Sequence, residues 1–144
     1  MYLVAVLDWF SRYVVSWQLS NTLDPDFCLQ ALHQALQVST PEIFNTDQGS
    51  QFTSADWIDE LKASNIKISM DGKGRWMDNV FIERLWRSLK YECVYLNAFD
   101  NMRDAKQQLN FWIEYYNHER PHSSLNDQTP NEVYEGIKPL SLAA

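Results

Sequence analysis

The chain has 144 residues, a formal net charge of −7 and 14% aromatic residues. This length suits one domain, and we expect residues 1–144 to share one packed core. The longest apolar run, Tyr2 to Leu7, is too short to span a bilayer and no export signal precedes it, which predicts a cytoplasmic protein. The acidic balance argues against a protein that grips nucleic acid unaided. Cys28 and Cys93 lack C-x-x-C spacing, so we expect buried thiols rather than a zinc site or a disulfide.

The first elements of the chain predict a hairpin followed by a covering helix. Two β-rich runs, Tyr2–Leu7 and Arg12–Leu19, are separated by a short turn. The first run is almost entirely apolar, so it should be buried on both faces and have a neighbouring strand on each side. Asp24 as N-cap and Pro25 predict the start of a helix that continues to about residue 38, and its apolar face, which includes Val38, should cover the sheet.

The middle of the chain predicts a strand, a helix and a second strand. Residues Glu42–Thr46 form a short strand that places Asp47 at its carboxyl end, where ligand sites of α/β sheets gather. Ser54 is expected to cap a helix over Ala55–Ala63, and Ile66–Met70 reads as the next strand. A basic, glycine-containing loop with Lys73 and Arg75 follows.

The last third is predicted to be helical. One helix carries Glu83, Arg87 and Lys90 on a shared face. A longer helix runs from about Met102 to Asn117, and helical spacing predicts that it buries Met102, Ala105, Leu109, Trp112 and Tyr116. A polar loop over 118–128 should precede a short helix, whose start is marked by the capping-type spacing of Thr129 and Glu132. We expect the remaining tail to fray.

Asp47 and Glu83 are the strongest candidates for chemistry. Taken singly, Asp47 is a turn residue and Glu83 a helical acid paired with Arg87, a contact worth about 0.2–0.5 kcal/mol. The 35 residues between the two acids leave room for a helix, a strand and a loop that bring them together. Mg²⁺ prefers oxygen ligands, and paired ions about 4 Å apart assist phosphoryl transfer. The pattern therefore predicts a metal site, with Lys90 holding a DNA phosphate.

Two other groups of residues leave alternatives open. His118 and His122 have H-x-x-x-H spacing, but Pro121 lies between them, so a hydrogen-bonding role in a surface loop is favoured over zinc binding. Trp76 could stack on a base, although tryptophans near helices more often belong to a core or an interface.

Four ordered motifs stand out along the chain: Leu7–Arg12, Thr46–Phe52, Trp76–Glu83 and Tyr116–Leu125. Together they resemble the catalytic core of bacterial insertion-sequence transposases, in the family named after insertion sequence three, whose fold is related to retroviral integrases. The resemblance covers nearly the whole chain.

The resemblance implies a ribonuclease H-like α/β fold, with a five-stranded mixed sheet flanked by helices. The family's catalytic set is two Asp and a Glu, with 35 residues between the last two and a basic residue seven beyond the Glu, and Asp47, Glu83 and Lys90 match that pattern. It implies that Asp47 and Glu83 bind Mg²⁺ or Mn²⁺, two ions in the complete enzyme, for cleavage at element ends and strand transfer to target DNA. The further DNA-contact candidates are Lys73, Arg75, Trp76, Asn79, Arg87 and Lys90.

The sequence departs from that family at the first Asp. In the family, the strand that carries the first catalytic Asp would precede Tyr2–Leu7, and Asp8 matches a different Asp, in a turn. We therefore expect a core that lacks its first strand and its first metal ligand. Little strand transfer by this chain alone is then expected, together with self-association through the open strand edge or association with full-length transposase. The alternative is an inactive remnant that serves only as an interaction module. Under both hypotheses we expect the protein in the bacterial cytoplasm, associated with the nucleoid.

Overall fold

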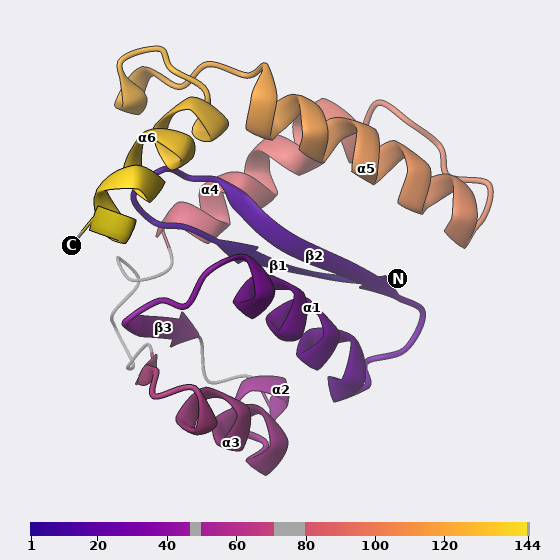
Figure 1. The fold of residues 1–144 in the computed structure, drawn as a ribbon. Helices are drawn as coiled ribbons and strands as arrows, with labels where there is room; N and C mark the ends of the chain where they lie inside the picture. Colours follow the sequence, from indigo (N-terminus) through magenta and orange to yellow (C-terminus); the bar gives the residue numbers. More distant parts are fainter. Residues whose placement is uncertain (47–49, 71–79, 144) are drawn as a thin grey trace. The chain divides into compact units, whose positions relative to one another are not determined.

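The computed structural model describes residues 1–46, 50–70 and 80–143, with side chains for 1–46, 51–69 and 80–136 (Figure 1). The chain divides into two compact units. The first contains Met1–Val6 and Ser16–Arg84, and the second contains Leu7–Val15 and Leu85–Ala144.

The predicted hairpin is present. Strands β1 (Tyr2–Leu7) and β2 (Val14–Ser20) pair in a two-stranded sheet. The second strand begins later than predicted because the turn occupies more of the chain. In that turn one carboxylate oxygen of Asp8 accepts hydrogen bonds from the backbone N–H (2.9 Å) and the hydroxyl (2.5 Å) of Ser11. Arg12 adopts a left-handed conformation with φ 64°, which lets the chain reverse.

The apolar composition of β1 predicts a neighbouring strand on each side, and one of these is found in the part of the chain that the structure describes. There β1 pairs with β2 alone. Val4 is accordingly the one fully buried residue of β1, and the strand's other residues keep part of their surface accessible. An apolar run is thus half-buried because one strand edge has no described partner.

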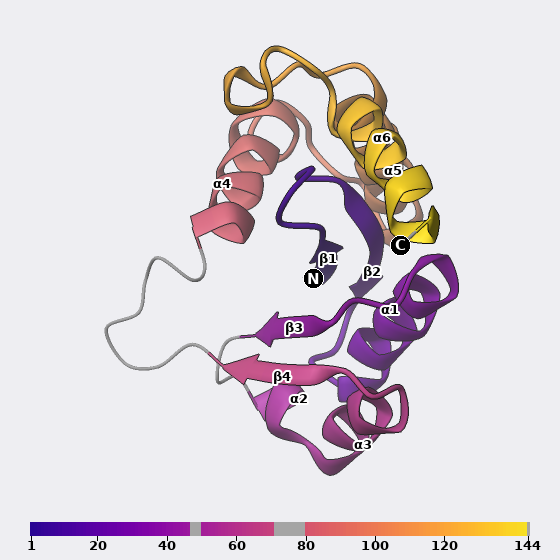
Figure 2. The same cartoon turned by 60° about the vertical axis from the view of Figure 1, so that its left-hand side comes forward.

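The strand–helix–strand segment in the middle of the chain is confirmed. Strand β3 (Ile43–Thr46) lies parallel to β4 (Lys67–Met70), with Thr46 opposite Met70 (Figure 2). Helix α3 (Ala55–Ala63) connects them, and the Ser54 hydroxyl accepts the backbone N–H of Trp57 at 3.4 Å, as the capping prediction requires. The short helix α2 (Ser50–Thr53) was not predicted.

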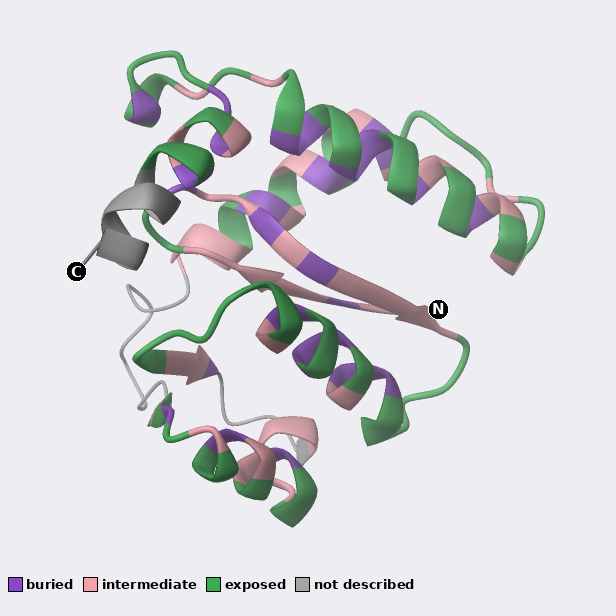
Figure 3. Cartoon of the chain, viewed as in Figure 1, coloured by how far each residue is buried: buried purple, intermediate pink, exposed green. Residues whose placement is uncertain are grey.

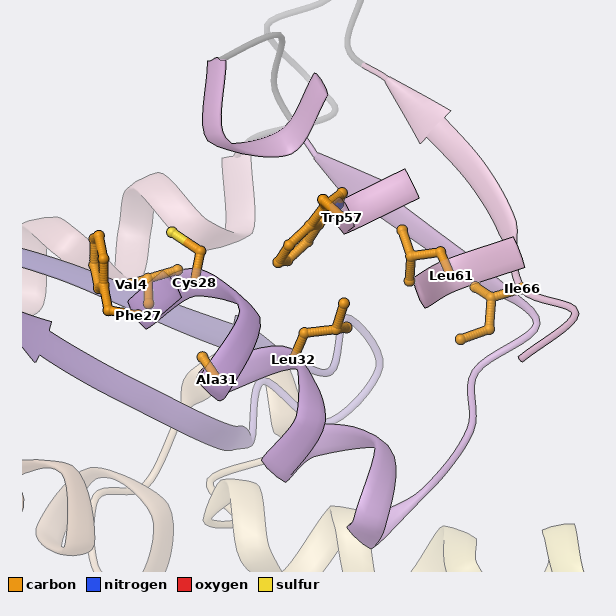
Figure 4. Packing of buried hydrophobic residues seen from close by; sticks show 8 residues of the cluster. All are labelled: Val4, Phe27, Cys28, Ala31, Leu32, Trp57, Leu61 and Ile66. Carbon is orange, nitrogen blue, oxygen red and sulfur yellow. The ribbon is translucent and has the colours of Figure 1, made fainter. Parts of the chain in front are cut away.

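Helix α1 (Pro25–Val38) organises the core of the first unit. It starts and ends where the sequence predicts, although Val38, expected on the apolar face, is 46% exposed. The Ser16 hydroxyl of β2 donates to the carbonyl of Ala31 at 2.6 Å and ties strand to helix. Each fully buried large side chain contributes about 1.5–3 kcal/mol. The cluster, shown in Figure 4, comprises Val4, Phe27, Cys28, Ala31, Leu32, Trp57, Leu61 and Ile66.

The second unit is helical. Its elements after the end of α4 (Val80–Leu89) are the π-helical turn η2 (Lys90–Val94), α5 (Met102–His118), the 3₁₀ turn η3 (Ser123–Leu125) and α6 (Pro130–Ala143). The long helix is confirmed, and α6 is longer than the short helix that the sequence predicts. No helix of the described residues has the length and apolarity that crossing a membrane requires.

Burial along α5 follows the predicted spacing with three exceptions, one of which is Ile113, 5% exposed although it was not assigned to the core. Ala105, Leu109 and Trp112 are buried, and buried and exposed positions alternate along the helix in Figure 3. Met102 is only half-buried, and Asn117, which was not assigned to the core, is 3% exposed. Both cysteines, Cys28 and Cys93, are free and buried, as predicted.

Candidate functional site

Glu83 lies in the first turn of α4, with an exposed side chain. The helix forms because Leu85 and Leu89, one turn apart, are buried on one side, while Glu83 and Arg87 are exposed on another. A carboxylate that protrudes from a helix in this way keeps both oxygens accessible to a metal ion or to solvent.

Arg87 and Lys90 are also exposed, four and seven residues after Glu83. At 100° per residue these spacings place the two cations within about 40° of Glu83 around the helix, so the predicted shared face is consistent with the backbone. Lys90 is the first residue of η2, where the backbone N–H of Tyr95 donates to the carbonyl of Lys90 at 2.9 Å. Such an i to i+5 bond widens the helix by one residue, a feature often found at functional sites.

A bidentate ion pair joins Arg120 to Glu92, two residues after Lys90. The Arg120 guanidinium donates to Glu92 through Nε, at 3.0 and 3.2 Å to the two carboxylate oxygens, and through Nη2 at 2.7 Å to Oε2. The same Nη2 lies 3.5 Å from the hydroxyl of Ser88. The hydrogen bond to Glu92 raises the pKa of Arg120 further above its already high value. Sequence analysis did not assign a role to either residue of the pair.

The other predicted site residues lie outside the described residues. These are Asp47, Lys73, Arg75, Trp76 and Asn79. What the structure does place is the residue before Asp47, Thr46, which ends β3 and is 7% exposed. Its hydroxyl oxygen is buried and has no hydrogen-bond partner among the described residues.

The donor set suits a hard divalent ion but is incomplete in the described part of the chain. Aspartate and glutamate oxygens are the ligands that Mg²⁺ prefers, and the unpartnered hydroxyl of Thr46 adds a polar atom beside Asp47. Within residues 1–46, 50–70 and 80–143, no group of three or more His, Cys, Asp or Glu residues could hold a metal ion. Asp8, which bonds Ser11 in its turn, acts as a structural acceptor.

The two histidines of the last motif make polar contacts, but the predicted surface-loop position holds only for His122, because His118 is the last residue of α5. His118 Nε2 lies 3.4 Å from Glu114 one turn earlier on α5, and His122 Nε2 lies 3.4 Å from Nη1 of Arg120. The His122 ring also meets Tyr116 edge-on, at 5.1 Å between centroids. The segment that was expected to be a polar loop is partly ordered by η3 and by a bridge between His122 and Gln128.

Comparison with known proteins identifies the chain. Residues 1–75 and residues 64–130 each match a family model described as integrase core domain. The chain belongs to the integrase core family.

The relatives of this integrase core are bacterial transposases. It is 35% identical over 135 residues to a protein assigned as transposase InsK of insertion sequence element IS150, and 34% identical over 136 residues to transposase InsF of insertion sequence IS3A, both from Escherichia coli K12. Each match covers 92% of this chain and 48% or 47% of the relative. The chain thus spans about half the length of these curated relatives.

Solved structures confirm the ribonuclease H-like fold. The catalytic core domain of BIV integrase matches with a TM-score of 0.78 over 97% of this chain and 89% of that one, at 18% identity. The HTLV-2 integrase catalytic core, solved in complex with magnesium, matches with a TM-score of 0.57 at 21% identity over 88% of this chain and 79% of the other.

Proposed function

We propose that this integrase core is the catalytic part of a transposase that cuts DNA at the ends of an insertion element and joins the freed ends to target DNA. The observation that carries the proposal is the similarity to insertion-sequence transposases across nearly the whole chain. The exposed face of α4 supports it, because Glu83 and Arg87 are exposed there and Lys90, the first residue of η2, is exposed directly after it.

Asp47 and Glu83 are proposed as ligands of Mg²⁺ or Mn²⁺, with two ions in the complete site. Bound divalent ions supply activation of the attacking oxygen and stabilisation of the leaving oxygen. The chain's own task is to hold carboxylate oxygens in place and to bring the DNA backbone to them. Glu83 suits this task because its side chain is exposed on a helix whose opposite side is fixed by buried leucines.

Arg87 and Lys90 are proposed to bind the phosphates of the DNA, since both project on the side of α4 that carries Glu83. Lys73 and Arg75 would add phosphate contacts, while Asn79 and Trp76 would contact the DNA near the cleaved bond. These few cations act against a net charge of −7. We therefore expect weak DNA binding, with a salt dependence set by these few phosphate contacts.

We also propose that the chain associates with itself or with full-length transposase in the bacterial cytoplasm, at the nucleoid where its DNA lies. Strand β1 supports this, because it has one strand partner among the described residues and an apolar composition. A strand edge of this kind can pair with another chain. Sedimentation of the purified chain should show a dimer or larger species, and a monodisperse monomer would contradict this part of the proposal.

The metal site can be tested by titrating the chain with Mn²⁺ and following the electron paramagnetic resonance of the free ion. Glu83→Gln and Asp47→Asn should each weaken Mn²⁺ binding at least about tenfold, because each removes one charged ligand. Glu42→Gln, a charge-matched change at an exposed position before β3, should have no effect. In Mg²⁺-dependent cleavage of element-end DNA, Glu83→Gln should abolish whatever activity the unmodified chain has. Equal Mn²⁺ affinity in all four proteins would refute the proposed ligands.

A further inference from the structure

The Arg120 side chain contacts the side chains of two residues that flank Lys90 in the sequence. Its guanidinium reaches Ser88, two residues before Lys90, at 3.5 Å, and Glu92, two residues after it, through three contacts of 2.7–3.2 Å. Two residues correspond to about 200° of helix rotation, so Ser88 and Glu92 lie on the side opposite Lys90. A grip on that side leaves the Lys90 side chain directed away from Arg120, in agreement with its exposure.

The grip coincides with a change of helix type. The α-helical pattern ends at Leu89 and the π-helical turn spans Lys90–Val94. A wider turn shifts the direction of every following side chain, and it needs interactions that favour it over continued α-helix. Glu92 lies inside that turn, and Arg120 holds it with a planar fork whose geometry matches a carboxylate.

Contacts with the end of α5 and with the His122 ring fix the position of Arg120. Its backbone N–H donates to the carbonyl of Tyr115 at 2.9 Å, at the end of α5, and Pro121 follows it. Its Nη1 lies 3.4 Å from the His122 ring, which rests against the buried Tyr116. The side chain of Arg120 is 25% exposed and that of Glu92 is 34% exposed, so neither is freely solvated. The Arg120–Glu92 ion pair therefore links the end of α5 to η2, the turn that begins at Lys90.

We propose that Arg120 is a positioning residue that acts through Glu92 to aim Lys90 at a DNA phosphate. The inference rests on the proposed function of the chain. In this role Arg120 contributes to DNA binding without contacting the DNA itself. The inference also predicts that the negative charge of Glu92 favours DNA binding. Simple electrostatics predicts the opposite for Glu92, because an acid near DNA repels phosphates.

The test measures the salt dependence of binding to double-stranded DNA for the full chain and five variants. Each phosphate contact contributes about 0.9 to the slope of log affinity against log salt. Lys90→Gln should lower the slope by about that amount. Glu92→Gln, Arg120→Gln and Arg120→Lys should lower it similarly, although Glu92→Gln removes an acid and Arg120→Lys keeps the charge. Arg103→Gln, at an exposed position of α5, is the charge-matched control for Arg120→Gln.

The double variant Lys90→Gln with Arg120→Gln separates positioning from an independent contact. If Arg120 acts through Lys90, the double variant should have the slope of Lys90→Gln alone. Amide hydrogen exchange at Tyr95, whose N–H bonds the carbonyl of Lys90, should rise in Glu92→Gln and Arg120→Lys but not in Arg103→Gln. Circular dichroism confirms folding, and if Arg120→Gln unfolds, the combination of Lys90→Gln with Arg120→Lys replaces it.

Three results would overturn the inference alone, and a fourth would overturn it together with the proposed function. Tighter DNA binding by Glu92→Gln would show that the acid acts by repulsion alone. If the slope of log affinity against log salt falls in the double variant by the amount expected for two phosphate contacts, Arg120 binds DNA itself. Binding that depends on Lys90 but not on Arg120 or Glu92 would refute the positioning role and leave the proposed function intact. Failure of the unmodified chain to bind DNA would instead refute the proposed function, and the inference with it.

Discussion

The side-chain amide of Asn117 pairs with both backbone groups of Val14. Its oxygen accepts the N–H of Val14 at 2.9 Å and its nitrogen donates to the carbonyl of Val14 at 3.1 Å. Both residues are 3% exposed. Helix α5 thus gives the first residue of β2 the pairing that a neighbouring strand would otherwise provide.

Asn117→Ala should destabilise the chain by about 2–4 kcal/mol, because it removes two hydrogen bonds and leaves a buried N–H and a buried carbonyl unpaired. Urea unfolding measures the change. Asn110→Ala, on the exposed side of the same helix, is the matched control and should shift stability by about 0.5 kcal/mol or less. Similar losses in the two variants would contradict the importance of the pairing.

The start of α6 depends on a reciprocal cap. The hydroxyl of Thr129 accepts the backbone N–H of Glu132 at 3.2 Å, and the carboxylate of Glu132 accepts the N–H of Thr129 at 3.1 Å. Thr129→Ala should therefore lower stability by about 1 kcal/mol, while Thr129→Ser, which retains the hydroxyl, should keep most of it. Thermal unfolding of the two variants decides, and an equal loss in both would assign the effect to the missing methyl group.

Local signals in the sequence identified most elements and the caps at Ser54 and Thr129, whereas Asp24, the predicted N-cap of α1, makes no side-chain capping hydrogen bond. Ser54 and Thr129 were recognised because a cap depends on residues within one turn, so the pattern is complete in the sequence. The apolar spacing of Ala105, Leu109 and Trp112 likewise identified the buried side of α5.

The interactions that escaped sequence reasoning are long-range or depend on backbone detail. The Asn117–Val14 pairing joins residues 103 positions apart, and nothing local distinguishes a buried Asn from an exposed one. The Arg120–Glu92 pair spans 28 positions, and the π-helical turn at Lys90 has no residue signature. In the candidate site the face shared by Glu83, Arg87 and Lys90 followed from helical periodicity, whereas the convergence of Asp47 with Glu83 remains a prediction.

Tyr116 should make stability decline at alkaline pH. Burial raises its pKa from about 10 to about 12, so the folded chain keeps the phenol proton where the unfolded chain loses it. The contribution is complete below pH 10 and is lost as the pH rises towards 12, for a total of roughly 2–3 kcal/mol. Urea unfolding at pH 8, 10 and 11 measures it. The matched variant Tyr116→Phe should show a smaller decline over this range, and an identical decline would place the titration elsewhere.

The thiols of Cys28 and Cys93 should be inert in the folded chain. They are 2% and 3% exposed, and burial raises both pKa values, that of Cys28 to about 11. Because the thiolate is the reactive form, low exposure and a raised pKa both slow alkylation at neutral pH. Ellman's reagent should therefore titrate almost no thiol in the native chain and both thiols in 6 M guanidinium chloride.

The Ser16→Ala variant, which lacks the hydrogen bond from β2 to α1, tests the same packing. Labelling of Cys28, which lies on α1, should be accelerated in this variant more than labelling of Cys93. Rapid labelling of Cys28 in the unmodified chain would show that α1 leaves its core readily, contrary to the packing described above.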